Sequence, residues 1–121
     1  MTYGKSVQAE LREPARALRR AIPDVLTGFA QMHEAALRPG VLDTKTKELM
    51  ALAIAVSKRC DGCIAAHARG SVRAGASEAE IAEAIGVAVL MDGGPATVYG
   101  PRAFAAAQEF LADRDQGAAS S

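Results

Sequence analysis

Apolar residues recur at three- and four-residue steps along most of the chain, which is the spacing of one face of an α-helix. One clear stripe contains Leu26, Phe29, Ala30, His33 and Leu37. Alternating apolar and polar positions, the pattern of a half-buried strand, are weak throughout. The pattern therefore predicts an all-α protein of about six helices.

Breaking and capping residues set the bounds of the first three predicted helices. We expect the first helix to begin at Pro14 and to stop before Pro23, which can start the second helix. The following "RPG" ends that helix, because proline cannot continue it and glycine tolerates positive φ. The third helix, over 45–59, is capped by Asp43 or Thr44. It is apolar around most of its girth, so we expect it to be buried centrally.

The same signals predict three further helices. Cys60 or Asp61 caps the fourth helix, which runs to about position 74 and closes at Gly75. The capping-box sequence "SEAE" opens the fifth helix at Ser77. "DGGP" breaks the chain before the last helix, where Pro101 is a candidate kink. We assign residues 1–114 to one helical domain and residues 115–121, "DQGAASS", to a disordered tail.

Composition narrows the functional class. Half of the 121 residues are apolar but only 4% are aromatic, so a core has to be built from aliphatic side chains and alanine. A domain of this size buries a limited share of its surface, and we expect subunit contacts to add stability. Fourteen basic residues balance fourteen acidic ones, which argues against a nucleic-acid binder.

The sequence also predicts a cytoplasmic protein without a membrane partner. The first twenty residues lack the apolar region of a signal peptide. The longest apolar runs are far shorter than the roughly 20 residues that a membrane span needs. In a reducing compartment, a single close cysteine pair is more often catalytic or metal-binding than structural.

The segment "CDGCIAAH" holds Cys60, Cys63 and His67, and these are the only two cysteines and one of the two histidines. Cys63 lies in the first turn of the predicted fourth helix, where free N–H groups and the helix dipole stabilise a thiolate. His67 follows four residues later on the same face and can accept the thiol proton. Cys60 can reach back to close a disulfide. This spacing favours a dithiol redox centre.

Other interpretations of the motif remain open at this point. A c-type haem site is excluded because Ile64, not histidine, follows the second cysteine. A thioredoxin-like module is excluded because no strand precedes the motif. A zinc site needs four ligands, which this segment does not supply alone. Simple packing of buried cysteines is the remaining alternative.

Glu48 precedes Cys60 by twelve residues, on the helix that leads into the motif. Two helices joined by so short a turn pack antiparallel, so Glu48 can face His67 across the pair. A carboxylate there would orient the imidazole, as the third member of a catalytic triad does. Spacing alone, however, favours an ordinary solvated or capping carboxylate at this position.

Several features together resemble the alkylhydroperoxidase D-like branch of the carboxymuconolactone decarboxylase superfamily. They are a "KxKELxAL" helix, a glutamate twelve residues before the first cysteine, CxxCxxxH, an "AxxxGAxxxEIxEA" stretch and a "GGPAxVxxPRA" segment. The resemblance covers roughly residues 40–110. It implies an all-helical bundle that assembles as a homotrimer or homohexamer.

The resemblance also implies a function: a thiol peroxidase that reduces hydroperoxides and is regenerated by a lipoyl or thioredoxin-type reductant protein. Carried over by position, the catalytic residues are Cys60, Cys63, His67 and the relay glutamate Glu48, with no cofactor or metal. We expect Cys63 to attack the peroxide and Cys60, at the more exposed edge, to meet the reductant. The alternatives are a decarboxylase acting on muconolactones and a non-enzymatic redox or zinc-binding oligomer.

Two points depart from the best-known peroxidases of that branch. Those enzymes carry a second histidine between the two cysteines, where this chain has Gly62. The chain also contains a single copy of the core region and is shorter than the best-known peroxidase. The remaining histidine, His33, matches no motif position, and we interpret it as a helix-face residue.

Overall fold

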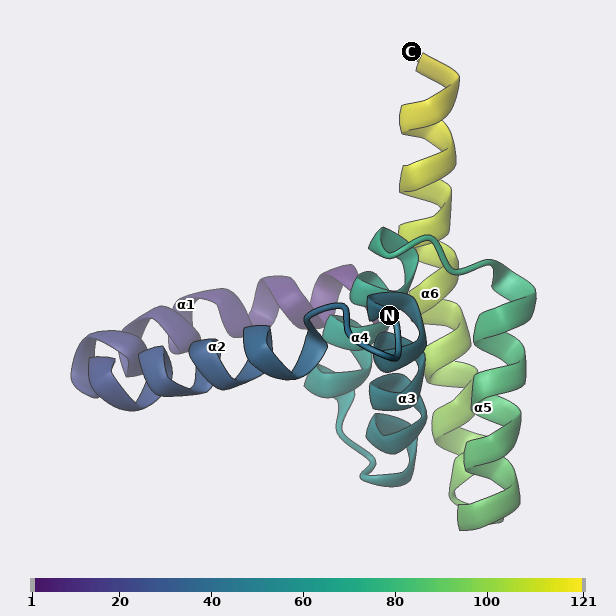
Figure 1. Cartoon of the computed structure of the whole chain (residues 1–121), viewed down its shortest axis with the longest axis horizontal. Helices are drawn as coiled ribbons and strands as arrows, with labels where there is room; N and C mark the ends of the chain where they lie inside the picture. The colour runs from purple at the N-terminus through teal and green to yellow at the C-terminus, as the bar shows by residue number, and fades with distance from the viewer. Residues whose placement is uncertain (1, 121) are drawn as a thin grey trace.

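The computed structural model describes the backbone of residues 2–120 and the side chains of residues 2–117, and all regular secondary structure in this range is helical, without strands (Figure 1). The prediction of an all-α protein with about six helices is confirmed. The helices are α1 (Lys5–Ala21), α2 (Pro23–Leu37), α3 (Thr44–Ser57), α4 (Asp61–Arg73), α5 (Glu78–Asp92) and α6 (Ala96–Ser120).

Helices α3 to α6 form the body of the molecule around one core. α3 packs against α4 and α5, and α6 packs against the same two helices. The helix predicted to be central, α3, thus contacts every other helix of the body. Aliphatic and alanine side chains make up most of the core, as the low aromatic content requires; they include Leu52, Val56, Ile64, Ile81, Ala103, Ala106 and Leu111. The small side chains on α6 allow it to approach its neighbours closely.

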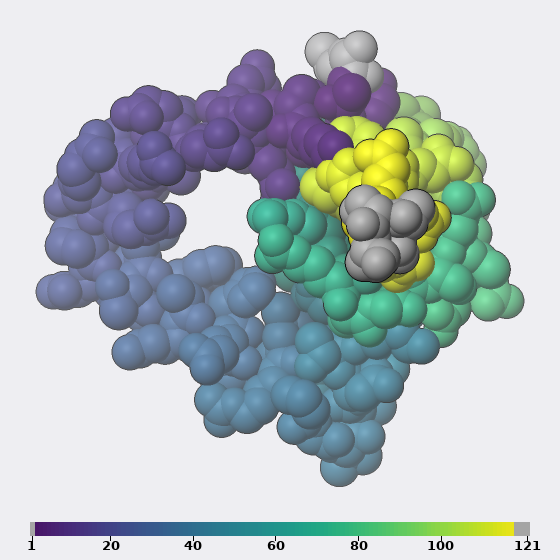
Figure 2. Space-filling model, turned by 90° about the horizontal axis from the view of Figure 1, so that it is seen from above, coloured from purple at the N-terminus to yellow at the C-terminus, as the bar shows by residue number. Residues whose placement is uncertain are grey.

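Helices α1 and α2 form an antiparallel arm that extends away from this body (Figure 1). Neither helix contains a buried residue. Figure 2 shows an opening between the arm and the body. The arm leaves large apolar side chains exposed, namely Leu18, Ile22, Val25, Phe29 and Met32. No helix within the described range is both long and apolar enough to cross a lipid bilayer.

The root of the arm is held by α6. The Glu109 carboxylate accepts hydrogen bonds from the backbone N–H groups of Tyr3, Gly4 and Lys5, at 3.1 to 3.3 Å. The N–H groups of Gly4 and Lys5 lie at the start of the helix, where no intrahelical carbonyl is available to accept from them. A side chain more than 100 positions away in the sequence therefore caps α1.

This distant cap explains why the predicted start of the first helix was wrong. We expected the helix to begin at Pro14, but α1 begins at Lys5 and Pro14 lies inside it. A proline inside a helix removes one backbone hydrogen bond. From the local sequence alone, Pro14 is therefore better placed at the start of a helix than in its interior. The predicted stop before Pro23 is confirmed, since α1 ends at Ala21 and Pro23 opens α2.

The other predicted boundaries lie close to the observed ones. Asp43 caps α3 by accepting a hydrogen bond from the Thr46 N–H, 2.8 Å away. Gly75 and Gly93 both have positive φ, 95° and 72°, where the chain leaves α4 and α5. α6 runs without interruption through Pro101 to Ser120. It therefore overlaps the segment 115–121 that we expected to be a disordered tail, while position 121 lies outside the described residues.

The capping box that opens α5 is present as predicted. The Ser77 hydroxyl accepts from the Glu80 N–H at 3.1 Å, and the Glu80 carboxylate accepts from the Ser77 N–H at 3.0 Å. Glu80 also pairs with Lys45 of α3 at 2.8 Å. The hydrogen bonds from Lys45 and from the Ser77 backbone lower the pKa of Glu80. A lowered pKa means that the ionised Glu80 carboxylate stabilises the fold. This contribution is present at neutral pH and is lost as pH falls through the titration range of the carboxyl group.

Two serines give opposite predictions for the same substitution. At pH 7, Ser77→Ala should lower the free energy of unfolding by about 1 kcal/mol, because it removes the cap of α5. Ser71 is completely buried in α4, and among the described residues its hydroxyl has no hydrogen-bond partner. Ser71→Ala should therefore leave the free energy of unfolding unchanged or raise it by about 1 kcal/mol. Urea unfolding at matched protein concentration measures both, and a larger loss for Ser71→Ala than for Ser77→Ala would contradict the roles assigned to these hydroxyl groups.

Candidate functional site

A tight turn reverses the chain between α3 and α4 and presents the cysteine motif. Arg59 adopts φ of 54°, in the left-handed region that residues other than glycine seldom enter. Cys60 follows in an extended conformation and donates its N–H to the Ala55 carbonyl at 3.2 Å. The turn ends α3 and starts α4 within three residues. The two helices consequently pack side by side, as the short connection predicts.

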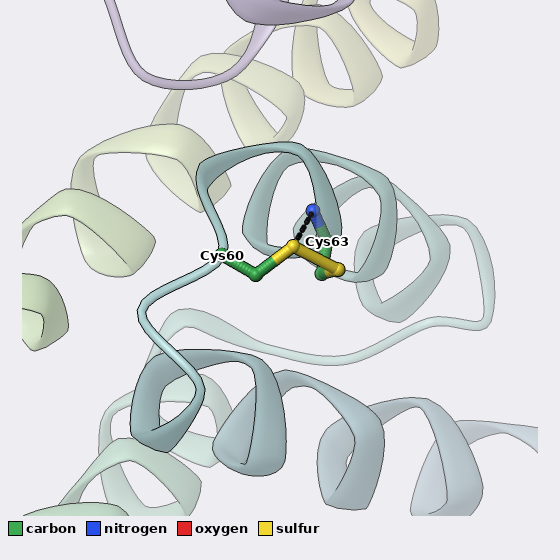
Figure 3. Close-up of a disulfide and its surroundings, with 2 residues drawn as sticks. All are labelled: Cys60 and Cys63. Carbon is green, nitrogen blue, oxygen red and sulfur yellow. Dashed lines mark hydrogen bonds between the residues drawn. A yellow bond between two sulfur atoms is a disulfide. The ribbon is translucent and has the colours of Figure 1, made fainter.

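Cys60 and Cys63 are joined by a disulfide at the start of α4 (Figure 3). Cys60 is the N-cap of this helix, and its Sγ accepts a hydrogen bond from the Cys63 N–H at 3.2 Å. The predicted ability of Cys60 to reach its partner is confirmed. The Cys60 sulfur occupies the place that a serine or aspartate oxygen takes in an ordinary N-cap. A negative charge on this sulfur would be stabilised by the N–H group and the helix dipole.

The exposure of the two cysteines is the reverse of our expectation. Cys63 is exposed, whereas Cys60 is partly buried at the turn. We expected Cys60 to lie at the more exposed edge, and this was wrong. The physical reason is the turn itself, because the extended Cys60 folds back against the end of α3 through its hydrogen bond to Ala55.

Glu48 and His67 meet across the α3–α4 pair. His67 Nδ1 lies 3.0 Å from Glu48 Oε1. The Glu48 side chain is only 6% exposed and the His67 side chain 20% exposed. Since a carboxylate accepts hydrogen bonds, Nδ1 carries the hydrogen and Nε2 is left free to accept a proton. Of the two interpretations of Glu48 that spacing allowed, the structure has the one in which it faces His67.

Gly70 makes room for this buried pair. It lies on α4 three residues after His67, and a Cβ atom on Gly70 would collide with the Glu48 carboxylate. Only a residue without a side chain lets α3 approach α4 closely enough to seat that carboxylate. Sequence reasoning missed Gly70, although an isolated glycine inside a helical pattern is a recognised signal of close packing.

The second histidine of the chain also reaches the site. The His33 ring, on α2, stacks on the His67 ring with centroids 5.8 Å apart and planes inclined by 18°. Phe29, one turn earlier on α2, contacts His33 with centroids 6.2 Å apart. Our interpretation of His33 as a helix-face residue did not include this contact. The only available signal was its presence in the apolar stripe of that helix.

The arm also accounts for the glycine between the cysteines. A Cβ atom at Gly62 would lie 3.2 Å from Leu11 Cδ1 of α1, which is tighter than ordinary van der Waals contact. A side chain at this position would require the Leu11 side chain to shift. Part of the space next to the motif is therefore filled by the arm instead of by a residue between the cysteines.

The described residues contain no cluster of three or more histidine, cysteine or acidic side chains that could hold a metal ion. The site consists instead of a disulfide at a helix N-terminus and, one turn further along α4, an imidazole bonded to a buried carboxylate. These groups can store two electrons and move a proton.

Gly70→Ala and Gly86→Ala form a matched pair of helix substitutions. Gly70→Ala should lower the free energy of unfolding by about 1 to 3 kcal/mol, because the new methyl group collides with Glu48. Gly86, in α5, is exposed and has nothing within 4 Å of the place that a methyl group would take, so Gly86→Ala should raise it by about 0.5 to 1 kcal/mol. Urea unfolding provides the measurement. Equal effects of the two substitutions would show that the α3–α4 contact at Gly70 is not tight.

Known proteins match both the sequence and the fold. A sequence profile of the Carboxymuconolactone decarboxylase family matches residues 23–109. A carboxymuconolactone decarboxylase family protein from Legionella pneumophila superposes with a TM-score of 0.85 at 38% identity, covering 88% of this chain and 96% of that one. Another, from Thermotoga maritima, gives a TM-score of 0.78 at 35% identity, covering 93% and 95%.

An uncharacterised protein of Cupriavidus necator is 34% identical over 101 residues, which are 84% of this chain and 89% of the relative. The family match spans the arm helix α2, the cysteine motif and most of α6. It agrees with the resemblance that the sequence motifs indicated. The chain belongs to the carboxymuconolactone decarboxylase family.

Proposed function

We propose that this protein is a thiol-dependent peroxidase that reduces hydroperoxides through its cysteine pair. The observation that carries the proposal is a Cys60–Cys63 disulfide one helical turn before His67, which is itself bonded to the buried Glu48. Such an arrangement combines a dithiol that can be oxidised reversibly with a base that can activate it.

Glu48 and His67 form the proton relay in this proposal. The Glu48 carboxylate holds the imidazole through Nδ1 and stabilises the imidazolium ion that forms when Nε2 accepts a thiol proton. Burial of Glu48 strengthens this interaction because few water molecules can screen it. The same imidazolium can afterwards return the proton to the alkoxide or hydroxide that leaves the peroxide.

The reaction proceeds in three steps. The thiolate attacks one peroxide oxygen, the O–O bond breaks, and water or an alcohol leaves with one proton from the relay, so that the sulfur becomes a sulfenic acid. The second thiol attacks this sulfur, forming the disulfide and releasing water. An external dithiol then reduces the disulfide by two successive thiol–disulfide exchanges and is itself oxidised to a disulfide.

Exposure and hydrogen bonding suggest how the two sulfurs divide these tasks. Cys63 is exposed and one turn before His67, so we assign it both the attack on the peroxide and the contact with the reductant. Cys60 then leaves as the thiolate when the reductant attacks Cys63. The Cys63 N–H stabilises that thiolate, and a better-stabilised thiolate leaves faster.

The partners follow from the same chemistry. We propose a hydroperoxide substrate, a lipoyl or thioredoxin-type reductant protein, and a cytoplasmic location where such dithiols stay reduced. A possible part in an antioxidative response has been attributed to the Thermotoga maritima relative. We also propose a homotrimer or homohexamer. Exposed apolar side chains on α3 and α5 support self-assembly, namely Met50, Ile54, Val87, Leu90 and Met91.

Cysteine substitution tests the proposed reaction. Cys60→Ser and Cys63→Ser should each abolish hydroperoxide consumption with dihydrolipoamide as reductant, because neither single thiol can complete the cycle. One equivalent of hydroperoxide should remove both free thiols of the reduced wild-type protein, and a dithiol should restore them. Wild-type rates in either variant, or retention of both thiols, would contradict the proposal.

Two further measurements separate the alternative functions. Turnover of carboxymuconolactone by protein whose thiols have been alkylated would support a decarboxylase that does not use the cysteines. About one zinc ion per chain in freshly purified protein would support a zinc-binding role. Either result, together with no hydroperoxide consumption, replaces the peroxidase proposal.

Glu48→Gln tests the relay separately from the dithiol. The amide keeps the shape of the side chain but cannot stabilise an imidazolium, so kcat/KM for hydroperoxide should fall about 10- to 100-fold. The number of oxidisable thiols should stay the same. Glu34→Gln is a suitable control, because Glu34 is exposed on α2. Equal activity in the two variants would remove Glu48 from the relay.

A further inference from the structure

Arg102 of α6 contacts the first residue of α4, directly beside the cysteine motif. Its Nη1 donates hydrogen bonds to both carboxylate oxygens of Asp61, at 3.1 and 3.3 Å. Asp61 follows Cys60 in the sequence and begins the helix that the Cys60 sulfur caps. The ion pair therefore lies at the same helix end as the disulfide.

Two tyrosine rings hold the guanidinium group in place. Arg102 Cζ lies 4.5 Å from the ring centroid of Tyr99, one turn earlier on α6, and 5.3 Å from that of Tyr3. Cation–π contacts of this kind restrict the rotamers of the arginine side chain. Without them, the entropy cost of holding this long side chain in one conformation would weaken the ion pair. The Arg102 side chain is 31% exposed, so it is partly shielded from solvent. Three separate segments of the chain, before α1, at the start of α4 and on α6, thus fix one positive charge beside the motif.

The charge of Asp61 bears on the chemistry of the cysteines. A carboxylate next to Cys60, and in the same first turn as Cys63, disfavours a second negative charge on either sulfur. Arg102 neutralises that carboxylate. With the pair intact, the stabilising effect of the helix N-terminus on a thiolate is left unopposed.

We propose that Arg102 is a positioning residue that keeps the thiols reactive and the disulfide reducible by neutralising Asp61. Arg102 lies in the "GGPAxVxxPRA" segment, which contains no residue of the cysteine motif or of the Glu48–His67 pair. The inference deepens the proposed function and rests on it, because it concerns the same dithiol. It requires only that the disulfide gains two electrons and two protons from an external thiol reductant, which is itself oxidised to a disulfide, to become two thiols.

The test measures the dithiol itself, without peroxide. Arg102→Gln should slow iodoacetamide alkylation of the reduced protein at pH 7 by about three- to tenfold, because it leaves the Asp61 charge uncompensated. At equilibrium with glutathione, the ratio of disulfide to dithiol should rise by a similar factor. Adding Asp61→Asn to Arg102→Gln should restore both values, since the offending charge is then removed.

Arg114→Gln is the matched control. Arg114 lies on the same helix and donates to the carbonyls of Val72, in the last turn of α4, and of Ala76, just beyond that helix, at 3.1 and 3.0 Å. Its loss should leave the alkylation rate and the glutathione equilibrium unchanged. If Arg114→Gln shifts them as Arg102→Gln does, the effect is one of fold stability and the proposal is overturned.

Two further results would overturn it. One is an unchanged alkylation rate in Arg102→Gln; the other is a slower rate that Asp61→Asn does not restore. If Arg102→Gln fails to fold, as circular dichroism would reveal, Asp61→Asn alone decides, because it should speed alkylation by leaving Arg102 unopposed. A protein that consumes no hydroperoxide but shows these shifts would refute the proposed function and leave the role of Arg102 standing.

Discussion

The site depends on the close approach of α3 and α4, which buries a carboxylate between them. A buried charge is tolerated only when it is paired and hydrogen-bonded, and here the His67 imidazole supplies the partner for Glu48. The absence of a side chain at Gly70 leaves the required space. The lack of a side chain at Gly70 thus permits the close packing of the two helices. With Glu48 seated there, the imidazole is held through Nδ1 and its other nitrogen, Nε2, stays free.

The start of α4 concentrates several effects on one pair of sulfurs. The turn through Arg59 leaves Cys60 as the helix cap, so a sulfur atom receives the N–H that an oxygen usually accepts. The following Asp61 adds a negative charge, and Arg102 from the last helix compensates it. The chemistry of a local motif is in this way linked to the packing of α6, which also caps α1 through Glu109.

The arm formed by α1 and α2 contributes little to the core, but it contacts the candidate site. Its own residues are not buried, yet it brings the His33 ring against His67 and Leu11 against Gly62. Gly62 is the position at which the best-known peroxidases of the resembling branch carry a histidine. In this chain the imidazole of His33, on a different helix and 34 positions away in the sequence, lies beside His67 instead.

The sequence by itself determined whatever depends on neighbours within a few residues. Apolar periodicity, the Ser77 capping box and the cysteine spacing are local, so they predicted the helices, their approximate ends and the disulfide. The short turn indicated the antiparallel α3–α4 pair and allowed Glu48 to face His67, although spacing alone favoured a solvated carboxylate. Only the tertiary structure decided the start of α1 and the contacts of His33 and Arg102. Each of these depends on which distant surface packs against a helix, and the local sequence does not encode that choice.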